Sequence, residues 1–357
     1  MPILFLVLHL FSVTSCDKGV SNADVRLNGL EKKILKIAKQ HNIPSIALQV
    51  KTSDDILNVN YSHPDVEEQV IYGIGSTTKF LSATLVFKLI EEGKLNLKDT
   101  VQDYVEDLAV FEKGDTIKIE NLLNHTSGLS DYTMSPEWRE TVVNGNGPKD
   151  FETKFSYIAS ELKNYGAYSY SNTNYLLLQK VVETILSKPY ETAFNDFFQS
   201  KGLENIRLDT AGSNLQAFYA ETDKGSADVS NWEENYGYDG GAYSIPDELN
   251  TFQQKFFIEE SLLNEKSIAL MTDWVSTNGM TIPIGEGIIS EYGHGIMKLN
   301  YNGEEYLGHA GGTLKYQSFM FYNPKKKIAV SVVTNCSGKY YNTIFFQEII
   351  PTVLDSL

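Results

Sequence analysis

The spacing of apolar residues changes along this chain, and this change constrains the fold more than any other feature of the sequence. Between about residues 120 and 201 the apolar residues recur at the spacing of amphipathic helices, most clearly in segments 156–162, 173–187 and 190–201. From residue 293 onwards they alternate as in strands, in segments 293–299, 305–308, 316–322 and 327–334. A helical middle therefore precedes a β-rich end.

The first hundred residues and the last hundred both combine predicted strands with predicted helices. A helix is predicted over residues 27–41, followed by strands over 45–51 and 56–61, and the chain closes on a predicted helix over 342–357. Further helices are predicted at 246–259 and 264–272. This order predicts an α+β fold in which residues 27–105 and 236–357 form one antiparallel sheet flanked by helices. Residues 106–235 are then a largely helical insert domain.

Ser76 and Lys79 stand three residues apart at the start of another predicted helix, directly after Gly75. On one helical face their Cβ atoms would lie roughly 5–6 Å apart. A serine hydroxyl is a weak nucleophile until a neighbouring base takes its proton, and a lysine can be that base where burial and a helix N-terminus lower its pKa. Because Ser160 and Lys163 have the same spacing without any sign of a site, the motif needs support from other stretches.

Three further stretches provide this support. Tyr170 and Asn172 form a Tyr-x-Asn pair within a polar segment. Residues 308–313 read Gly-His-Ala-Gly-Gly-Thr between two strand-like runs, and residues 122–129 read Leu-Leu-Asn-His-Thr-Ser-Gly-Leu. Each stretch is a modest signal alone, but together with the Ser76 motif, and in this order, they are specific.

These motifs resemble those of the beta-lactamase-related serine hydrolases, which include class C beta-lactamases, penicillin-binding DD-carboxypeptidases, D-aminopeptidases and esterases. The resemblance extends from about residue 27 to the C-terminus. It implies a beta-lactamase/transpeptidase-like fold, which agrees with the predicted layout, and hydrolysis through an acyl-enzyme without a cofactor. The substrate is then a small molecule or a peptide that supplies the acyl group.

The resemblance also implies roles for individual residues. Ser76 is expected to be the acylated nucleophile, Lys79 its activating partner and Tyr170 the general base. Asn172 is expected to hydrogen-bond Lys79 or the substrate amide. His309 occupies the place of the lysine in the Lys-Thr-Gly motif of class C enzymes, where some DD-peptidases and esterases have His-x-Gly.

Two glycines of the same motif complete the expected site. Gly311 is expected to let substrate lie against the strand, and the backbone N–H groups of Ser76 and Gly312 are expected to form the oxyanion hole. The next residue after His309 is Ala310, which has no hydroxyl, and a histidine with a pKa of about 6.5 is mostly neutral at pH 7. Binding of a substrate carboxylate is therefore expected to be weak, which favours esters, amides or D-amino-acid peptides over beta-lactams.

Two other functions stay open at this point. One is a beta-lactamase or DD-carboxypeptidase acting on cell-wall peptides. The other is a non-catalytic penicillin-binding or sensor module, against which the joint presence of Ser76, Lys79, Tyr170 and Asn172 argues. His125 is expected to stabilise its own turn rather than to take part in chemistry.

The charge balance excludes one class of partner. The 46 acidic residues exceed the 30 basic ones, which gives a net charge of −16, whereas nucleic-acid binding needs clustered lysine and arginine. The basic triplet 325–327 lies between two strand-like runs and is expected to be a hairpin turn. No His/Cys cluster has the spacing of metal ligands, so neither nucleic acid nor a metal is expected.

The N-terminus has the pattern of an export signal. Residues 1–15 carry no charge, and their apolar run is too short to span a bilayer. Residues 13–16 resemble a bacterial lipoprotein cleavage site, so Cys16 is expected to carry the lipid and residues 16–26 to form a tether. This would anchor the protein outside the cytoplasm, at the periplasmic face or the outer membrane. No lysine or arginine precedes the apolar run, which departs from the usual pattern, and a plain secretory signal is the alternative.

Overall fold

The computed structural model describes residues 22–65, 71–111, 114–159, 161–208, 219–222, 225–279 and 281–357. The predicted signal peptide and Cys16 lie outside the described residues. The end of the predicted tether overlaps helix α1 (Asn22–Gln40), which begins five residues earlier than expected. Within the described ranges, no helix combines the length and the apolar character that a membrane crossing requires.

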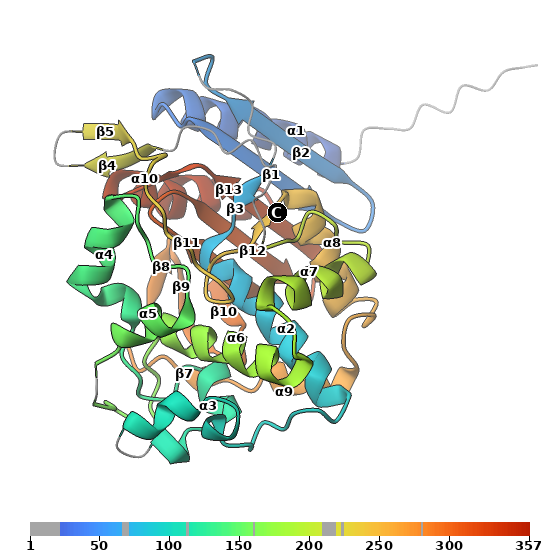
Figure 1. The fold of residues 1–357 in the computed structure, drawn as a ribbon. Helices are drawn as coiled ribbons and strands as arrows, with labels where there is room; N and C mark the ends of the chain where they lie inside the picture. Colours follow the sequence, from blue (N-terminus) through green and yellow to red (C-terminus); the bar gives the residue numbers. More distant parts are fainter. Residues whose placement is uncertain are drawn as a thin grey trace, which may run out of the picture.

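A nine-stranded antiparallel sheet forms the centre of the described part of the molecule (Figure 1). Its strand order is β2-β1-β13-β12-β11-β10-β9-β7, and β8 pairs with β9 beside this path. The bounds are β1 (Ser45–Lys51), β2 (Ile56–Ser62), β7 (Val275–Ser276), β8 (Ile282–Ile284), β9 (Gly287–Tyr292), β10 (Met297–Tyr301), β11 (Glu304–Gly312), β12 (Gln317–Asn323) and β13 (Ile328–Thr334). Because β1 pairs with β13, the two ends of the chain share one sheet, as predicted.

The predicted strands are confirmed with two corrections. The strand predicted over 305–308 continues to Gly312 in β11, so His309 to Gly312 lie within a strand rather than between two strands. The hairpin over residues 323–328 joins β12 to β13 as expected. The strand predicted over 293–299 is wrong in its first half, because the Gly293 N–H bonds to the Ile296 carbonyl and Gly295 has a φ of +85°. Those residues form a turn, and β10 begins after it. Strand β9, which precedes the turn, was not predicted because its buried and exposed residues do not alternate regularly.

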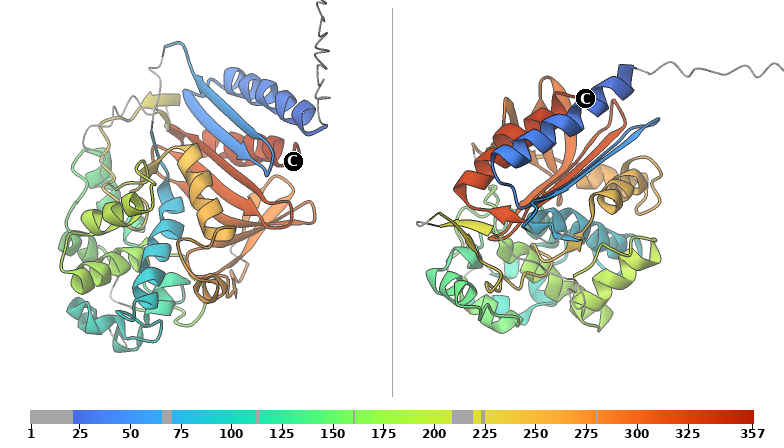
Figure 2. Two further views of the ribbon diagram at one scale, coloured as in Figure 1. Left: turned by 90° about the vertical axis from the view of Figure 1, so that its right-hand side faces the viewer. Right: turned by 90° about the horizontal axis from the view of Figure 1, so that it is seen from above.

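The first and last helices cover one face of the sheet. In Figure 2, α1 lies beside the C-terminal helical segment on this face. That segment consists of α10 (Lys339–Ile344), a π-helix (Phe345–Ile349) and α11 (Ile350–Leu354). The fully or almost fully buried side chains between these helices and the strands include Leu30, Ile34, Ala38, Leu48, Val50, Phe319, Val332, Phe345, Ile349 and Val353.

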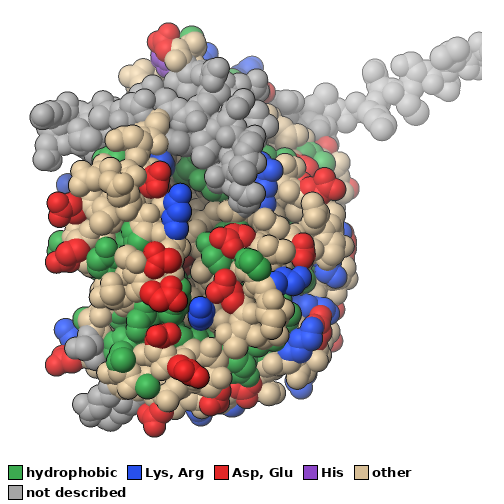
Figure 3. All heavy atoms as spheres, in the orientation of Figure 1, with side chains coloured by type: hydrophobic (Ala, Val, Ile, Leu, Met, Phe, Trp, Pro, Cys, Tyr) green, Lys and Arg blue, Asp and Glu red, His purple; other side chains and the backbone are tan. Residues whose placement is uncertain are grey.

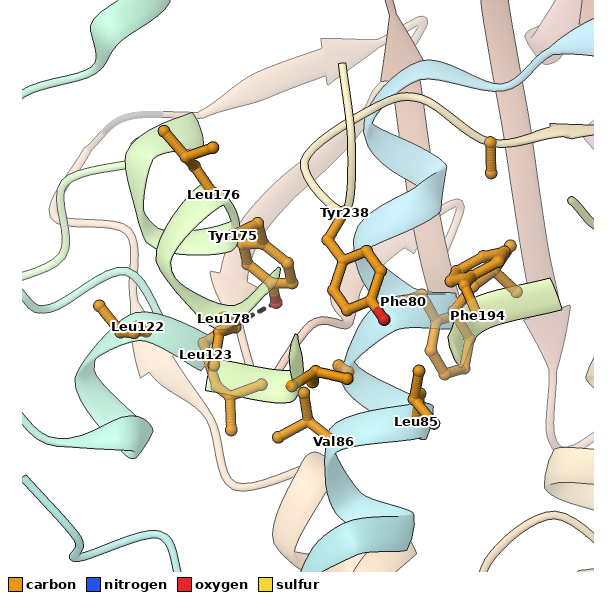
Figure 4. Close-up of a cluster of buried hydrophobic side chains, with 14 of the residues drawn as sticks. Phe80, Leu85, Val86, Leu122, Leu123, Tyr175, Leu176, Leu178, Phe194 and Tyr238 are labelled. Carbon is orange, nitrogen blue, oxygen red and sulfur yellow. Dashed lines mark hydrogen bonds between the residues drawn. The ribbon is translucent and has the colours of Figure 1, made fainter. Parts of the chain in front are cut away.

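The other face of the sheet meets α2 (Thr78–Glu91) and α8 (Pro246–Phe257). Helix α2 is buried on almost every side because helices from the middle of the chain pack around it. These and the neighbouring helices are α3 (Ile119–Leu123), α4 (Pro136–Val143), α5 (Phe151–Ser156), α6 (Asn172–Leu186), α7 (Tyr190–Ser200) and α9 (Glu265–Met271). Figure 4 shows Phe80, Leu85 and Val86 of α2 pointing into the apolar cluster that these helices share.

The helix predicted over residues 156–162 is wrong, since α5 ends at Ser156. Asp150 caps the start of α5 through a 2.8 Å bond from the Thr153 N–H, which sets the helix several residues earlier. The chain then turns, and the Ala159 N–H donates to the Ser130 hydroxyl at 2.8 Å. A tertiary contact therefore replaces the helical bonds that the local pattern suggested.

Two small sheets complete the fold. Strand β3 (Tyr72–Gly73) pairs with β6 (Tyr243–Ser244). Strand β14 (Cys336–Ser337) pairs with β4 (Tyr219–Thr222), which forms a hairpin with β5 (Gly225–Asp228). The middle of the chain therefore contains a hairpin besides its helices, and the domain boundaries at 105/106 and 235/236 stay predictions.

Candidate active site

Ser76 lies in a 3-10 turn (Gly75–Thr77) that leads directly into α2 and packs against β11. Gly75 has a φ of +49°, and a Cβ on it would come within 2.8 Å of the Gly312 nitrogen. The Ser318 hydroxyl donates to the Ile74 carbonyl at 2.6 Å and lies 2.7 Å from the Thr77 hydroxyl. These contacts fix the turn on the sheet and leave the Ser76 side chain half-buried at the end of α2.

Lys79 is completely buried, and its ammonium group has three hydrogen-bond partners. Nζ donates to Ser76 Oγ at 3.1 Å, to Asn172 Oδ1 at 2.6 Å and to the backbone carbonyl of Asp239. Burial lowers the pKa of Lys79 to about 8, although the carboxylates of Asp239 and Asp131 act in the opposite direction. A lysine in this environment loses its proton far more readily than a surface lysine does.

Tyr170 comes from the segment before α6, and its ring lies beside Lys79, with Nζ 4.9 Å from the ring centroid. Burial raises the pKa of Tyr170 well above its ordinary value of 10, and the neighbouring Ser76 hydroxyl lowers it only in part. The Tyr170 hydroxyl is shielded from solvent and has no hydrogen bond of normal geometry among the described residues. Tyr170 is therefore neutral here, so the pKa directions favour Lys79 over Tyr170 as the base.

Asn172, the first residue of α6, connects Lys79 to an acidic group. Its Oδ1 accepts from Lys79, and its Nδ2 donates to Asp131 Oδ2 at 3.0 Å and to the Thr133 hydroxyl at 3.1 Å. The hydroxyl and the backbone N–H of Thr133 also donate to Asp131 Oδ1. The amide of Asn172 is thus held in one orientation, with its oxygen toward Lys79.

His309 lies on β11 and is fully buried. Its Nδ1 is 2.6 Å from the Ala310 carbonyl, which can only accept, so Nδ1 carries the proton and Nε2 accepts from the Tyr292 hydroxyl at 3.0 Å. Burial lowers the pKa of His309 to about 3, and the nearby charge of Lys79 acts in the same direction. A neutral ring with both nitrogens engaged does not offer a cation to a substrate carboxylate.

The two glycines of β11 differ in what surrounds them. A Cβ on Gly311 would come within 2.2 Å of the Ile74 carbonyl and 2.9 Å of the Thr77 nitrogen. This glycine therefore lets the turn that carries Ser76 pack on the strand. That is a different reason from the predicted one, which was room for substrate. Gly312 is exposed, and a Cβ on it would meet nothing within 4 Å. The contact between Gly75 and Gly312 brings the backbone around Ser76 close to that of Gly312. An oxyanion hole formed by the N–H groups of Ser76 and Gly312 requires this proximity.

Sequence reasoning missed two contributors to this site. Neither the Asp131 carboxylate nor the contact of the Asp239 carbonyl with Lys79 was predicted from the sequence. The Asp239 carboxylate accepts from the Tyr132 hydroxyl at 2.7 Å and from the Gly237 N–H at 2.9 Å, which aims its carbonyl at Lys79. No local motif marks either aspartate, because they lie 52 and 160 residues from Lys79 in the chain.

A side pocket of about 720 Å³ lies near Ser76, although Ser76, Lys79 and Tyr170 are not among its lining residues. Its lining includes Gly240, on which a Cβ would lie 3.6 Å from the Gly75 carbonyl carbon, and Thr313, which follows Gly312 in the chain. The remaining wall carries five aromatic and five charged side chains, namely Tyr190, Trp232, Tyr236, Tyr243, Tyr316, Lys149, Glu191, Glu233, Glu234 and Lys315. Figure 3 shows one face of the molecule, over the middle of which acidic side chains are the commonest charged groups. Among the described residues, no three His, Cys, Asp or Glu side chains form a group that could hold a metal ion.

Comparison with known proteins identifies the fold. Solved structures with the same fold include the D-amino acid amidase from Ochrobactrum anthropi SV3, with a TM-score of 0.77, 19% identity and coverage of 92% of this chain and 98% of that one. A D-stereospecific amidohydrolase from Streptomyces sp. has a TM-score of 0.74, 21% identity and coverage of 88% and 97%. These likenesses establish the beta-lactamase/transpeptidase-like fold.

Sequence relatives define the family. The Beta-lactamase family model matches residues 30–343, so the chain belongs to this family of serine hydrolases and amidases. Protein flp of Staphylococcus aureus (strain MW2) is 28% identical over 320 residues, which cover 85% of this chain and 62% of that protein. The putative penicillin-binding protein PbpX of Bacillus subtilis (strain 168) is 25% identical over 303 residues, or 78% and 71% of the two chains. The chain thus spans under two thirds of the length of Protein flp.

Proposed function

We propose that this protein is a serine hydrolase that cleaves an ester, an amide or a D-amino-acid peptide bond through an acyl-enzyme on Ser76. The observation that carries this proposal is the fully buried Lys79, whose pKa is lowered to about 8 and whose Nζ lies 3.1 Å from the Ser76 hydroxyl. Near neutral pH a useful fraction of such a lysine is unprotonated and can take the serine proton. A scaffold that only binds has no need for a buried lysine with this pKa.

The proton steps follow from the opposite pKa shifts of Lys79 and Tyr170. Neutral Lys79 accepts the proton of Ser76 while Oγ attacks the carbonyl carbon of the substrate. The neutral Tyr170 hydroxyl then donates a proton to the leaving group and is reprotonated by Lys79, as the bond between the acyl group and the leaving group breaks. In deacylation, water attacks the ester carbon, its proton passes to Lys79, and Ser76 is released with its own proton restored.

The negative charge on the tetrahedral intermediate needs two donors. The backbone N–H groups of Ser76 and Gly312 are proposed for this role, since Gly75 packs directly on the Gly312 backbone and Gly312 faces open space. Removal of one such donor typically costs a factor of about 10²–10³ in kcat.

The side pocket supports a substrate with a substantial acyl part. Its volume of about 720 Å³ exceeds what a single small acyl group fills, and its lining includes Thr313, the residue after Gly312 of the proposed oxyanion hole. The related D-amino acid amidase and D-stereospecific amidohydrolase share the fold, so D-amino-acid amides and short peptides with D-residues are the first substrates to test.

The strand side of the site argues against efficient beta-lactam turnover. His309 is neutral and both of its nitrogens are engaged, while Ala310 and Gly312 have no hydroxyl. The Thr313 hydroxyl oxygen accepts the N–H groups of Lys315 and Tyr316, so it closes its own turn. Recognition of a penicillin carboxylate therefore lacks a free cation and a free hydroxyl on β11.

The test uses residues 22–357, which keep all of α1, and the Ser76→Ala variant. Hydrolysis of D-phenylalanine amide, a D-alanyl-D-alanine peptide and p-nitrophenyl acetate is measured beside nitrocefin, and the intact mass is recorded seconds after mixing with a penicillin. We expect turnover of at least one ester or amide by the wild type alone, with little nitrocefin turnover. Rapid nitrocefin hydrolysis would instead support the beta-lactamase alternative. Failure of every substrate and of a fluorophosphonate probe to react with Ser76 would support the non-catalytic sensor module.

We also propose that Cys16 carries a lipid anchor that holds the protein at a bacterial membrane outside the cytoplasm. The support comes from the uncharged apolar run before residue 16 and the small residues that precede the cysteine. Expression of the full chain and of Cys16→Ser, followed by membrane fractionation and mass analysis of the N-terminus, tests this. A wild-type protein that stays in the soluble fraction would rule out the anchor.

A further inference from the structure

His125 lies in the loop after α3 and contacts Tyr170 in the core of the site. The ring of His125 stacks on the Tyr170 ring with a centroid distance of 4.2 Å and an angle of 32° between the planes. His125 is fully buried and has a φ of +58°, a backbone conformation that is uncommon for residues other than glycine. Its expected role was to stabilise its own turn, but this placement points to a second role.

His125 accepts two hydrogen bonds from backbone N–H groups on either side of Tyr170. The Ser169 N–H donates to the His125 carbonyl at 2.8 Å, and the Ser171 N–H donates to Nδ1 of the His125 ring at 3.2 Å. The residue between these donors is Tyr170 itself. His125 therefore fixes the backbone on both sides of Tyr170 through hydrogen bonds and contacts one face of the Tyr170 ring.

The tautomer of His125 follows from its partners. A backbone N–H can only donate, so the Nδ1 that receives the Ser171 N–H must be unprotonated, and Nε2 carries the hydrogen. Asn174 Nδ2 also donates to Nδ1, at 2.9 Å, and the Ser127 hydroxyl fixes that amide by donating to Asn174 Oδ1 at 2.6 Å. Burial and the nearby charge of Lys79 lower the pKa of His125 well below its ordinary value, so Nδ1 stays an acceptor at neutral pH.

We infer that His125 is a positioning residue for Tyr170, which it holds so that the phenol oxygen stays next to Ser76 and Lys79. This inference rests on the proposed function, because it gives the Tyr170 hydroxyl the proton transfer to the leaving group. His125 itself touches neither the nucleophile nor the base through a hydrogen bond, so it acts through Tyr170. The packing of Tyr292, which meets the His125 ring edge-on at 4.8 Å, closes the cluster from the strand side.

The test compares His125→Ala, His125→Asn and His294→Asn with the wild type. Asparagine tolerates a positive φ and its side-chain oxygen can accept the Ser171 N–H, so His125→Asn restores part of what alanine removes. His294 is the matched control, since it is a second buried histidine that bonds the Leu270 carbonyl and packs on Phe87 away from Tyr170. Kinetics with p-nitrophenyl acetate, thermal unfolding and a crystal structure of His125→Ala are the readouts.

We expect His125→Ala to lower kcat by about 100-fold with KM changed by less than about threefold, because a misplacement near 1 Å costs this much. His125→Asn should recover about tenfold of the loss, and His294→Asn should lose stability but not kcat. If His125→Ala is unfolded, the comparison of His125→Asn with His294→Asn decides. Equal kcat values for folded His125 variants and the wild type would overturn the positioning role.

The crystal structure of the His125→Ala variant distinguishes a failure of the positioning role from a failure of the proposed function. If the wild type hydrolyses nothing, the proposed function fails, but a Tyr170 ring displaced in His125→Ala would still support the positioning role. A Tyr170 ring that keeps its place in His125→Ala would overturn it, whatever the activity of the wild type.

Discussion

The helical wall and the strand wall of the site use their polar atoms in different ways. On the helical wall, hydrogen bonds run without interruption from Ser76 through Lys79 and Asn172 to Asp131. On the strand wall, His309 is bonded within β11 and to Tyr292, and Gly312 presents only backbone. The candidate proton-transfer groups are thus hydrogen-bonded to one another, whereas the strand wall has no charged group. We therefore expect catalysis and recognition of an anionic substrate to be separable properties in this chain.

The comparison predicts the largest effect for Lys79. Lys79→Met keeps the side-chain volume but removes the buried amine beside Ser76, and it leaves the Asn172 oxygen and the Asp239 carbonyl without this donor. We expect kcat/KM to fall by about 10⁴-fold in steady-state assays with p-nitrophenyl acetate. The matched control is Lys154→Met, since Lys154 is also buried but donates to the Asn235 carbonyl away from Ser76. If Lys154→Met caused an equal loss, general destabilisation would explain both results.

Tyr170→Phe should have the next largest effect. The ring keeps its place beside Lys79 and on His125, so only the hydroxyl is lost. We expect kcat to fall by about 10²–10³-fold, the usual contribution of a proton-transfer group, with little change in thermal stability. Tyr168→Phe removes a buried hydroxyl two residues earlier and should keep kcat within about twofold. A fully active Tyr170→Phe variant would mean that Lys79, and not Tyr170, donates the proton to the leaving group.

Asp131→Asn tests the far end of the chain of hydrogen bonds. The Asp131 carboxylate raises the pKa of Lys79, so its neutralisation should lower that pKa and move the acidic limb of the pH profile of kcat/KM to lower pH. We expect a shift of about half to one pH unit, with a rate loss near tenfold. Asp150→Asn, which preserves a capping oxygen on α5, should leave the limb in place. An unshifted limb in Asp131→Asn would mean that another group sets it.

The smallest effect is expected on the strand wall and concerns stability. His309 has a pKa lowered to about 3, so the unfolded chain takes up a proton below pH 6.5 that the folded protein does not. Stability should therefore fall as the pH drops from 6.5 toward 3, by about 2 kcal/mol between pH 6.5 and 5 for this one group. His309→Asn should remove that share of the slope in urea unfolding measured at both pH values. Identical slopes in the variant and the wild type would contradict the buried neutral state.

The sequence predicted the fold well where local patterns and long elements agree. The strands β1, β12 and β13 and the helices α6 and α7 lie within a residue or two of the predicted segments, because their apolar spacing is set by burial on one or two faces. The turn at residues 293–296 and the early end of α5 were not predictable in this way. Both depend on hydrogen bonds to a neighbour that only the folded chain provides, such as the bond from Ala159 to Ser130.

The same distinction between local patterns and tertiary contacts applies to the residues of the candidate site. Ser76, Lys79, Tyr170 and Asn172 were found from short motifs and lie together. Asp131, the Asp239 carbonyl and the positioning contacts of His125 were not found, because each is brought to Lys79 or Tyr170 from a separate loop. Their residue types alone are common on any loop, so no spacing distinguishes them.

The sequence by itself determined the order of most helices and strands, the family, and the choice of Ser76 and Lys79 as candidate nucleophile and base. The tertiary structure alone decided which of these groups is charged. A pKa depends on how far a group is removed from water and on which charges surround it, and both follow from packing between distant segments. Burial lowers the pKa of Lys79 and raises that of Tyr170, which is why we propose opposite proton-transfer roles for these two neighbouring side chains.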